Sequence, residues 1–332
     1  MVTRILAARR DNPEALGFLA TLLFACLASV RDVYLGGLLQ RLHPLDFTLV
    51  AFGLCTLLFF PAAAVRTPES LRVLARHPAL LFGVNATSAL AWIAFFYALR
   101  AVEPSIVQLL FSGVGPLSVL WIERLLPGAP TSGALARGER MVLSGLFGAV
   151  VLAGAVVLAG RSAMGPQPIG IAALGVALAV VSGVSISVST MLCRQLNDHG
   201  VSPTALVGVR FLGALAAAAA LRGGADGPGL DGAIWSAAGL GGVLLAALLL
   251  IVLPIFVNQI GISLASPLTV RVVVAVGPVL ILALQVVEGR LSPSAYSLAA
   301  ALTYAVFAVA ATLVRRRAVT ALPAAPARPR EP

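Results

Sequence analysis

Two arginines lie inside apolar stretches of this sequence, where a charge is costly. Arg210 and Arg271 each stand about seven residues after the predicted start of a segment, roughly 10 Å deep if that segment is a helix. A charge at such depth faces a cavity or a partner, and arginine binds carboxylate or phosphate through paired hydrogen bonds. The alternative is snorkelling, in which the long side chain reaches back to the polar surface. The first alternative predicts an anion site.

Four amides are further candidates for ligand contacts. Asn85 and Gln108 lie within apolar segments, whereas Asn258 and Gln259 occupy a predicted short turn between two such segments. Amides in an apolar environment either join neighbouring helices or line a wet cavity, and the sequence leaves both alternatives open. Gln108 is slightly favoured as a cavity residue because it lies two turns before Pro116, in an element that the chain repeats.

Asp32 is the one acid well inside a predicted apolar segment. Burial disfavours the charged form of a carboxylate, so Asp32 is the candidate for a proton-coupling group. We favour the alternative of a surface pair with the adjacent Arg31 at the outer end of the segment. The other acids lie near segment ends or in loops, so the sequence does not require coupling to protons.

The sequence offers no residue pattern for enzymatic chemistry. His43, His77 and His199 lie near segment ends without metal-ligand spacing, and no nucleophile stands beside a base. A glycine-rich phosphate loop is absent from the sequence, which argues against ATP hydrolysis. The three cysteines show no paired spacing, so they indicate neither a disulfide framework nor a zinc site. We expect a protein that is not an enzyme and uses no cofactor or metal.

Composition shows that the segments carrying these residues are membrane helices. Of the 332 residues, 59% are hydrophobic and 11% charged, with a mean hydropathy of +0.99, whereas soluble domains are about 25% charged. A helix crosses the hydrocarbon core with about 20 apolar residues. That rule predicts an all-α integral membrane protein in the lipid bilayer with ten spans. They are residues 16–37, 46–65, 79–99, 104–122, 141–160, 168–192, 203–221, 234–256, 262–286 and 293–314.

The basic residues indicate orientation rather than nucleic-acid binding. All 23 are arginines, and they are scattered at segment ends instead of forming one stripe. With the N-terminus inside, 15 fall on cytoplasmic segments and 6 at external ends, as the positive-inside rule expects. We expect an inner (plasma) membrane protein with both termini cytoplasmic. Residues 1–15 would form an N-terminal segment and residues 316–332 a disordered tail.

The chain repeats itself at an interval close to half its length. Gly115-Pro116 recurs as Gly277-Pro278, 162 residues later, and two other X-Pro pairs recur at similar intervals. Residues 16–160 and 161–315 each hold five predicted spans. Because five is odd, the second half must enter the membrane upside down relative to the first. The predicted fold class is therefore ten helices arranged as two inverted five-helix repeats, an architecture typical of carriers with a central site.

The repeats differ at the residues that could bind a ligand. Aligning the second span of each half places Ala51 opposite Arg210, and matching the Gly-Pro pairs places Leu109 opposite Arg271. Proline inside a helix frees a carbonyl and permits a bend, so Pro116 and Pro278 are predicted hinges. We expect the helical framework to be symmetric between the two halves and the candidate ligand-binding residues to differ between them.

The chain resembles the drug/metabolite transporter superfamily, in particular its ten-span EamA-type members, over about residues 15–315. Residues 97–116, 265–278, 203–212 and 288–291 carry the resemblance. It implies a secondary transporter of small metabolites that works by alternating access, with export favoured. Members carry amino acids, drugs, sugars, nucleotides and other metabolites. The deep arginines point toward a substrate with a carboxylate or phosphate, such as an amino acid.

Two alternatives remain at the level of the whole chain. The chain could be a non-transporting membrane scaffold or assembly protein that retains the transporter fold, and it could be a monomer or a homodimer. Small residues recur every four positions along 175–187 and 145–153, and such faces let helices approach closely. We expect these faces to pack within the monomer in preference to forming a dimer.

Overall fold

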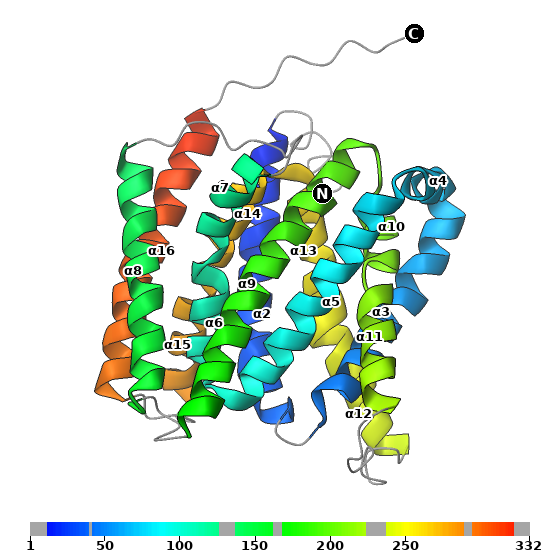
Figure 1. Ribbon diagram of the computed structural model, residues 1–332. Helices are drawn as coiled ribbons and strands as arrows, with labels where there is room; N and C mark the ends of the chain where they lie inside the picture. Colours follow the sequence, from blue (N-terminus) through cyan, green and yellow to red (C-terminus); the bar gives the residue numbers. More distant parts are fainter. Residues whose placement is uncertain are drawn as a thin grey trace.

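The computed structural model describes residues 12–39, 42–125, 137–161, 168–223, 237–288 and 294–321. These residues form a bundle of helices, and no strand occurs among them (Figure 1). Residues 1–11 of the predicted N-terminal segment, most of the loop after the fourth span and residues 289–291 of the family-like turn lie outside the described part. The same holds for residues 322–332 of the predicted tail.

Ten helical spans in the described chain are long and apolar enough to cross a membrane, which confirms a multi-pass membrane protein. Six spans are single helices. These are α2 (Pro13–Leu39), α3 (Pro44–Arg66), α5 (Pro78–Ala101), α8 (Arg137–Leu158), α9 (Ile169–Asp198) and α16 (Ala295–Ala321). The fourth, seventh, eighth and ninth spans are each built from shorter pieces. These are α6 (Pro104–Gly113) with α7 (Gly115–Leu125), α10 (Pro203–Val209) with α11 (Leu212–Gly223), α12 (Ala237–Ala247) with η1 (Leu248–Val252) and α13 (Leu253–Leu264), and α14 (Pro267–Val274) with α15 (Gly277–Glu288).

The repeated X-Pro pairs are helix starts. Proline begins α3, α6, α10 and α14, where its missing N–H is not needed and its fixed φ suits the first turn. Ser202 and Ser266 cap α10 and α14, each accepting a hydrogen bond from the backbone N–H three residues later.

Three spans are interrupted near the middle of the bundle. The fourth breaks between Gly113 and Gly115, and the ninth breaks between Val274 and Gly277. The seventh breaks at Arg210, which stands between α10 and α11. Broken helices are tolerated in a membrane where the freed backbone groups are covered by protein or face a cavity. The interruptions therefore mark the place to look for a site.

The eighth span corrects the sequence prediction. It runs Gly239–Leu264, so Asn258 and Gln259 lie inside α13 and not in a turn at its end. Pro254, at the second position of α13, does not end the helix. The chain continues because the π-helical segment η1 lets the proline fall in the first turn of α13. The ninth span accordingly begins at Pro267, five residues later than predicted.

Two smaller differences concern the ends of spans. α4 (Pro68–Arg76), which was not predicted, is an amphipathic helix that buries Ser70 and Leu74 between the second and third spans. α16 continues to Ala321, so the predicted tail is helical over its first residues. Figure 1 places the start of α2 and the end of α16 at the same end of the bundle, which is drawn at the top.

The helices pack in a regular pattern. α5 lies along α9, α2 along α13, and α8 along α16, while α6 and α7 pack on α9, and α14 and α15 pack on α2. Small residues allow the closest approaches: Gly175 faces Ala101 and Val102, and Gly183 faces the Phe111 carbonyl of α6. The small-residue face of α9 therefore packs within the chain, as expected.

Candidate functional site

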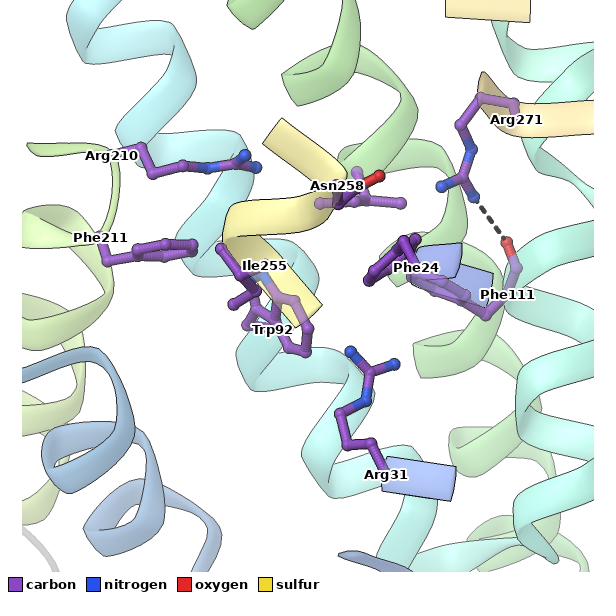
Figure 2. A pocket seen from close by; sticks show the side chains of 10 residues that line it. Phe24, Arg31, Trp92, Phe111, Arg210, Phe211, Ile255, Asn258 and Arg271 are labelled. Carbon is purple, nitrogen blue, oxygen red and sulfur yellow. Dashed lines mark hydrogen bonds between the residues drawn. The ribbon is translucent and has the colours of Figure 1, made fainter. Parts of the chain in front are cut away.

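A small cavity lies in the middle of the bundle, beside two of the helix breaks. Its polar lining comes from Arg31, Arg210, Arg271 and Asn258, and its apolar lining from Phe24, Trp92, Phe111, Ile186, Phe211 and Ile255. Figure 2 shows three guanidinium groups reaching toward it from α2, from the break after α10, and from α14. The cavity measures about 20 Å³, which has room for about one water molecule. The site as it stands therefore has no room for a metabolite.

Arg210 is held by neutral oxygens. Its side chain is 2% exposed, and its Nη1 donates to Gln259 Oε1 at 2.7 Å. Its Nη2 donates to Ser189 Oγ at 3.1 Å and to Ser88 Oγ at 3.4 Å. Nε is buried without a hydrogen-bond partner among the described residues. The groups that position Arg210 leave its positive charge uncompensated.

Arg271 is held by a carbonyl and an aromatic ring. Its side chain is 3% exposed, its Nη2 donates to the Phe111 carbonyl at 3.3 Å (Figure 2), and its guanidinium lies 5.2 Å from the centre of the Phe111 ring. That guanidinium packs against Gly115, where a methyl group would come within 2.5 Å of Nε. Like Arg210, Arg271 has a buried Nε without a partner among the described residues. Neither arginine snorkels.

Arg31 and Asp32 form the predicted pair, but the pair is buried and not at the surface. Arg31 is 2% and Asp32 0% exposed, and Arg31 Nε donates to Asp32 Oδ1 at 2.6 Å. The Arg31 guanidinium lies 5.2 Å from the centre of the Trp92 ring. α2 extends to Leu39, so the pair lies more than a turn before the end of its helix. Arg31 is a cavity residue that was not predicted from the sequence, although its place in a predicted span was a signal.

The four amides take different places. Asn258 lines the cavity, and Gln259 binds Arg210 from the next position of α13. Asn85 instead joins two helices, because its Oδ1 accepts the Gly213 N–H at the start of α11 at 2.8 Å. Gln108 is 1% exposed and its Oε1 has no partner among the described residues. The structure thus brings Asn258 and Gln259 together with the arginines and places Asn85 outside the cavity lining.

The predicted hinge prolines lie at the helix breaks, and a serine covers the carbonyl at each break. Ser29 of α2 donates to the Gly277 carbonyl at 3.2 Å, and Ser187 of α9 approaches the Gly115 carbonyl at 3.5 Å. Pro116 and Pro278 each follow such a glycine in the first turn of α7 and α15.

The structural counterpart of Arg271 is Gln108, not Leu109. Gln108 packs against Gly277 as Arg271 packs against Gly115. Gln108 and Arg271 each stand four residues after the proline that begins their helix, Pro104 and Pro267, but Gly115 follows its proline by 11 residues and Gly277 follows its proline by 10, so matching the Gly-Pro pairs is off by one residue.

Polar contacts join neighbouring spans at both ends of the bundle. At the end where α2 begins, the Glu14 carboxylate accepts the Ser266 N–H at 3.0 Å and the Thr269 hydroxyl at 2.8 Å. An acid at the start of α14 complements the helix dipole. In the same region, Arg194 Nη1 donates to carbonyls at the end of α13, including that of Ser263 at 3.0 Å. These bonds hold the junction between the eighth and ninth spans.

At the opposite end, Arg222 of α11 pairs with Asp46 of α3 at 3.0 Å. His43 caps α3 by accepting the Leu45 N–H on Nδ1, and partial burial, assisted by Arg222 and Arg100, lowers its pKa. The folded state therefore favours the neutral form of the His43 imidazole. Its contribution to stability is present above the unfolded value of 6.5 and declines as the pH falls below that value.

The arrangement suits an anion better than a metal. Within the described residues, no group of three or more histidine, cysteine, aspartate or glutamate side chains could hold a metal ion. Three guanidinium groups and an amide surround the cavity, and Asp32 is the carboxylate that pairs with one of them. Aromatic rings and two isoleucines form the remaining walls. A carboxylate or phosphate attached to an apolar body matches this chemistry.

Comparison with known proteins identifies a fold. No family model matches the sequence, and no curated protein matches it. A solved protein crystal structure aligns with 92% of this chain and 98% of its own, with a TM-score of 0.61 and 22% sequence identity. A likeness at this identity extends to the fold along nearly the whole of both chains and not to function.

Proposed function

We propose that this protein is a secondary membrane transporter of small organic anions that works by alternating access between two inverted five-helix repeats. One observation carries the proposal: Arg210 and Arg271 are buried at a central cavity, and none of their described partners is a carboxylate. An uncompensated buried charge is expensive. An anionic substrate bound for part of a transport cycle would supply the missing charge.

The packing pattern supports the inverted repeats. An inverted repeat relates each span to its counterpart in the other half, five places along, so the third corresponds to the eighth and the sixth to the first. The third span packs closely on the sixth, and the eighth packs closely on the first. The same operation relates the fourth span on the sixth to the ninth on the first. The Gly-Pro breaks and their serine contacts obey it too. Such symmetry gives the inward-open and outward-open states similar energies.

The closed cavity fits one step of such a cycle. A site with room for about one water molecule cannot admit a metabolite until helices move apart. The broken spans provide places where such movement costs few hydrogen bonds. As in the drug/metabolite transporters that the sequence resembles, we propose export across the inner membrane, with both termini in the cytoplasm.

Flux in reconstituted vesicles tests this proposal. Purified protein should give saturable flux of radiolabelled benzoate or inorganic phosphate, the first being a carboxylate with an apolar body. Replacing Arg271 by Ala should lower the substrate affinity by about 10- to 100-fold, because it removes a charge-assisted contact worth about 1.5–3 kcal/mol. Replacing the exposed Arg72 of α4 by Ala is the matched control and should leave flux unchanged.

The same assay separates the transporter from the alternative of a membrane scaffold. A scaffold would give no flux above that of empty vesicles with any ligand. In a scaffold, Arg271→Ala would change neither flux nor ligand binding, because a scaffold binds no ligand. Folding of each variant is checked by its elution as a single species in detergent.

A further inference from the structure

The pairing of Arg31 with Asp32 suggests how a charged ligand changes this site. We propose that Asp32 is an internal counter-ion: a bound anion replaces it at Arg31, and Asp32 takes up one proton as it is released. This inference rests on the proposed function, because it assumes that the cavity binds anions. It makes Asp32 a determinant of when the site accepts a ligand, although Asp32 is not part of the cavity lining.

The pair is poorly satisfied as it stands. One bond joins Arg31 Nε to Asp32 Oδ1 at 2.6 Å. Asp32 Oδ2 and Arg31 Nη1 are both buried without a partner among the described residues. A buried carboxylate that lacks hydrogen bonds on one oxygen carries a large desolvation cost. A ligand that offers two oxygens to the guanidinium would satisfy Arg31 better than Asp32 does.

Arg31 is placed to meet such a ligand. Its guanidinium points into the cavity in Figure 2, on the side opposite Arg210 and Arg271. Phe24, Trp92 and Phe95 lie around it, with ring centres 5.2–6.0 Å from the guanidinium carbon. An anion near the middle of the cavity would therefore be shared among three cations. Asp32 has access to one of them.

The charge balance decides which carboxylate keeps its charge. Two carboxylates at one guanidinium in an apolar interior repel each other, and one of them becomes protonated. The ligand is stabilised by several guanidinium groups, so Asp32 is the group that gives up its charge. The exchange balances: an anion and a proton enter from water, the Arg31–Asp32 contact breaks, an Arg31–ligand contact forms, and Asp32 ends as a neutral acid.

Other titratable groups near α2 do not offer an equivalent acid. Of the helices packed on α2, α14 carries Arg271 and α16 carries Tyr304 at cavity depth. α5 carries Tyr97 and Arg100 near its end, and α6 follows Glu103 at its N-cap. α13 has no titratable side chain, and neither does η1 or the described side chains of α15. Arg31 is the group that contacts Asp32.

Calorimetry on the wild-type protein in detergent gives the first test. Benzoate is titrated in two buffers that differ in ionisation enthalpy, which reports the protons taken up per ligand bound. We expect about one proton, and a Kd that weakens about tenfold for each pH unit between pH 6 and 8. Binding without proton uptake would overturn the role of Asp32 and leave the anion site standing. No binding of benzoate or phosphate would overturn both.

Substitution gives the second test. Asp32→Asn cannot take up the proton, so its benzoate affinity should be independent of pH and tighter than that of the wild type at pH 8. Asp46→Asn is the matched control, because it removes another largely buried acid from an arginine pair and Asp46 is not part of the cavity lining. The control should keep the wild-type pH dependence. A pH dependence that survives in Asp32→Asn would refute the inference, and the wild-type proton count decides the matter if that variant does not fold.

Discussion

A guanidinium group can be kept in an apolar interior only if its N–H groups find acceptors, and the three arginines here meet that need in different ways. Arg31 uses a carboxylate, Arg210 uses an amide and two hydroxyls, and Arg271 uses a backbone carbonyl and a ring. Neutral acceptors position a cation without cancelling its charge. The two arginines of the second half are therefore ready to attract an anion, whereas Arg31 must first exchange its partner.

Gly115 offers a way to disturb Arg271 without removing it. A methyl group there would lie within 2.5 Å of Nε, and the clash involves the mobile end of a long side chain. Gly115→Ala should therefore fold normally and displace the guanidinium from its place. We expect benzoate affinity to fall about tenfold, the cost of weakening one charge-assisted contact, as measured by calorimetry.

Gly53→Ala is the control for that change. Gly53 lies in α3 with open space where the methyl group would stand, so this variant should bind benzoate as the wild type does. It should also be slightly more stable, since alanine favours a helix by up to about 1 kcal/mol over glycine. Equal affinity in both variants would show that the place of Arg271 beside Gly115 is irrelevant to binding.

At the scale of the elements, the interrupted spans build the site. Each Gly-Pro pair begins a new helix after a break, and a serine from the first helix of the opposite predicted repeat contacts its carbonyl. The two contacts differ in length, 3.2 Å for Ser29 and 3.5 Å for Ser187. Gln108 and Arg271 pack against the glycines of opposite breaks, so the two halves present different side chains at matching places.

Restoring continuity at both breaks should impair transport. Pro116→Ala with Pro278→Ala supplies N–H groups that can bond the carbonyls four residues earlier, at Ser112 and Val274, and so straighten the two spans. We expect vesicle flux of benzoate to fall at least about tenfold, while the protein still inserts into the membrane, since neither change lowers hydropathy. Membrane yield and flux are measured on the same preparation.

Pro61 provides a comparison within the same chain. It lies inside α3, a span that continues through it to Arg66. Pro61→Ala should leave flux close to that of the wild type, because no break is closed by the change. Normal flux in the double variant would mean that the Gly-Pro breaks do not act as hinges.

At the scale of the whole molecule, the start of α2 and the end of α16 lie on the same side of the bundle (Figure 1). The arginine distribution predicts that side to be the cytoplasm. In a variant without Cys26, Cys55 and Cys193, a membrane-impermeant maleimide added to intact cells should label Arg161→Cys and not Arg72→Cys. The two positions are exposed at opposite ends of the bundle. Labelling of position 72 alone would reverse the orientation and with it the direction proposed for transport.

Much of the architecture could be predicted because membranes restrict it so strongly. Length and hydropathy located ten spans, since a backbone in hydrocarbon must satisfy its own hydrogen bonds. The two Gly-Pro pairs, whose prolines were predicted as hinges, lie at two of the helix breaks. The eighth span was misjudged at Asn258 and Gln259 because a π-helical segment, which depends on packing, carries the helix past Pro254.

The sequence by itself predicted ten apolar spans, a number that the described part of the chain contains, and placed Arg210 and Arg271 inside two of them. Only the tertiary structure decided that these arginines meet Arg31 and Asn258 at one cavity, that Asn85 joins helices, and that the Arg31–Asp32 pair is buried. The physical reason is that hydropathy acts along each segment and can be read residue by residue. Which side chains converge depends on helix rotation and on contacts between spans that lie far apart in the chain.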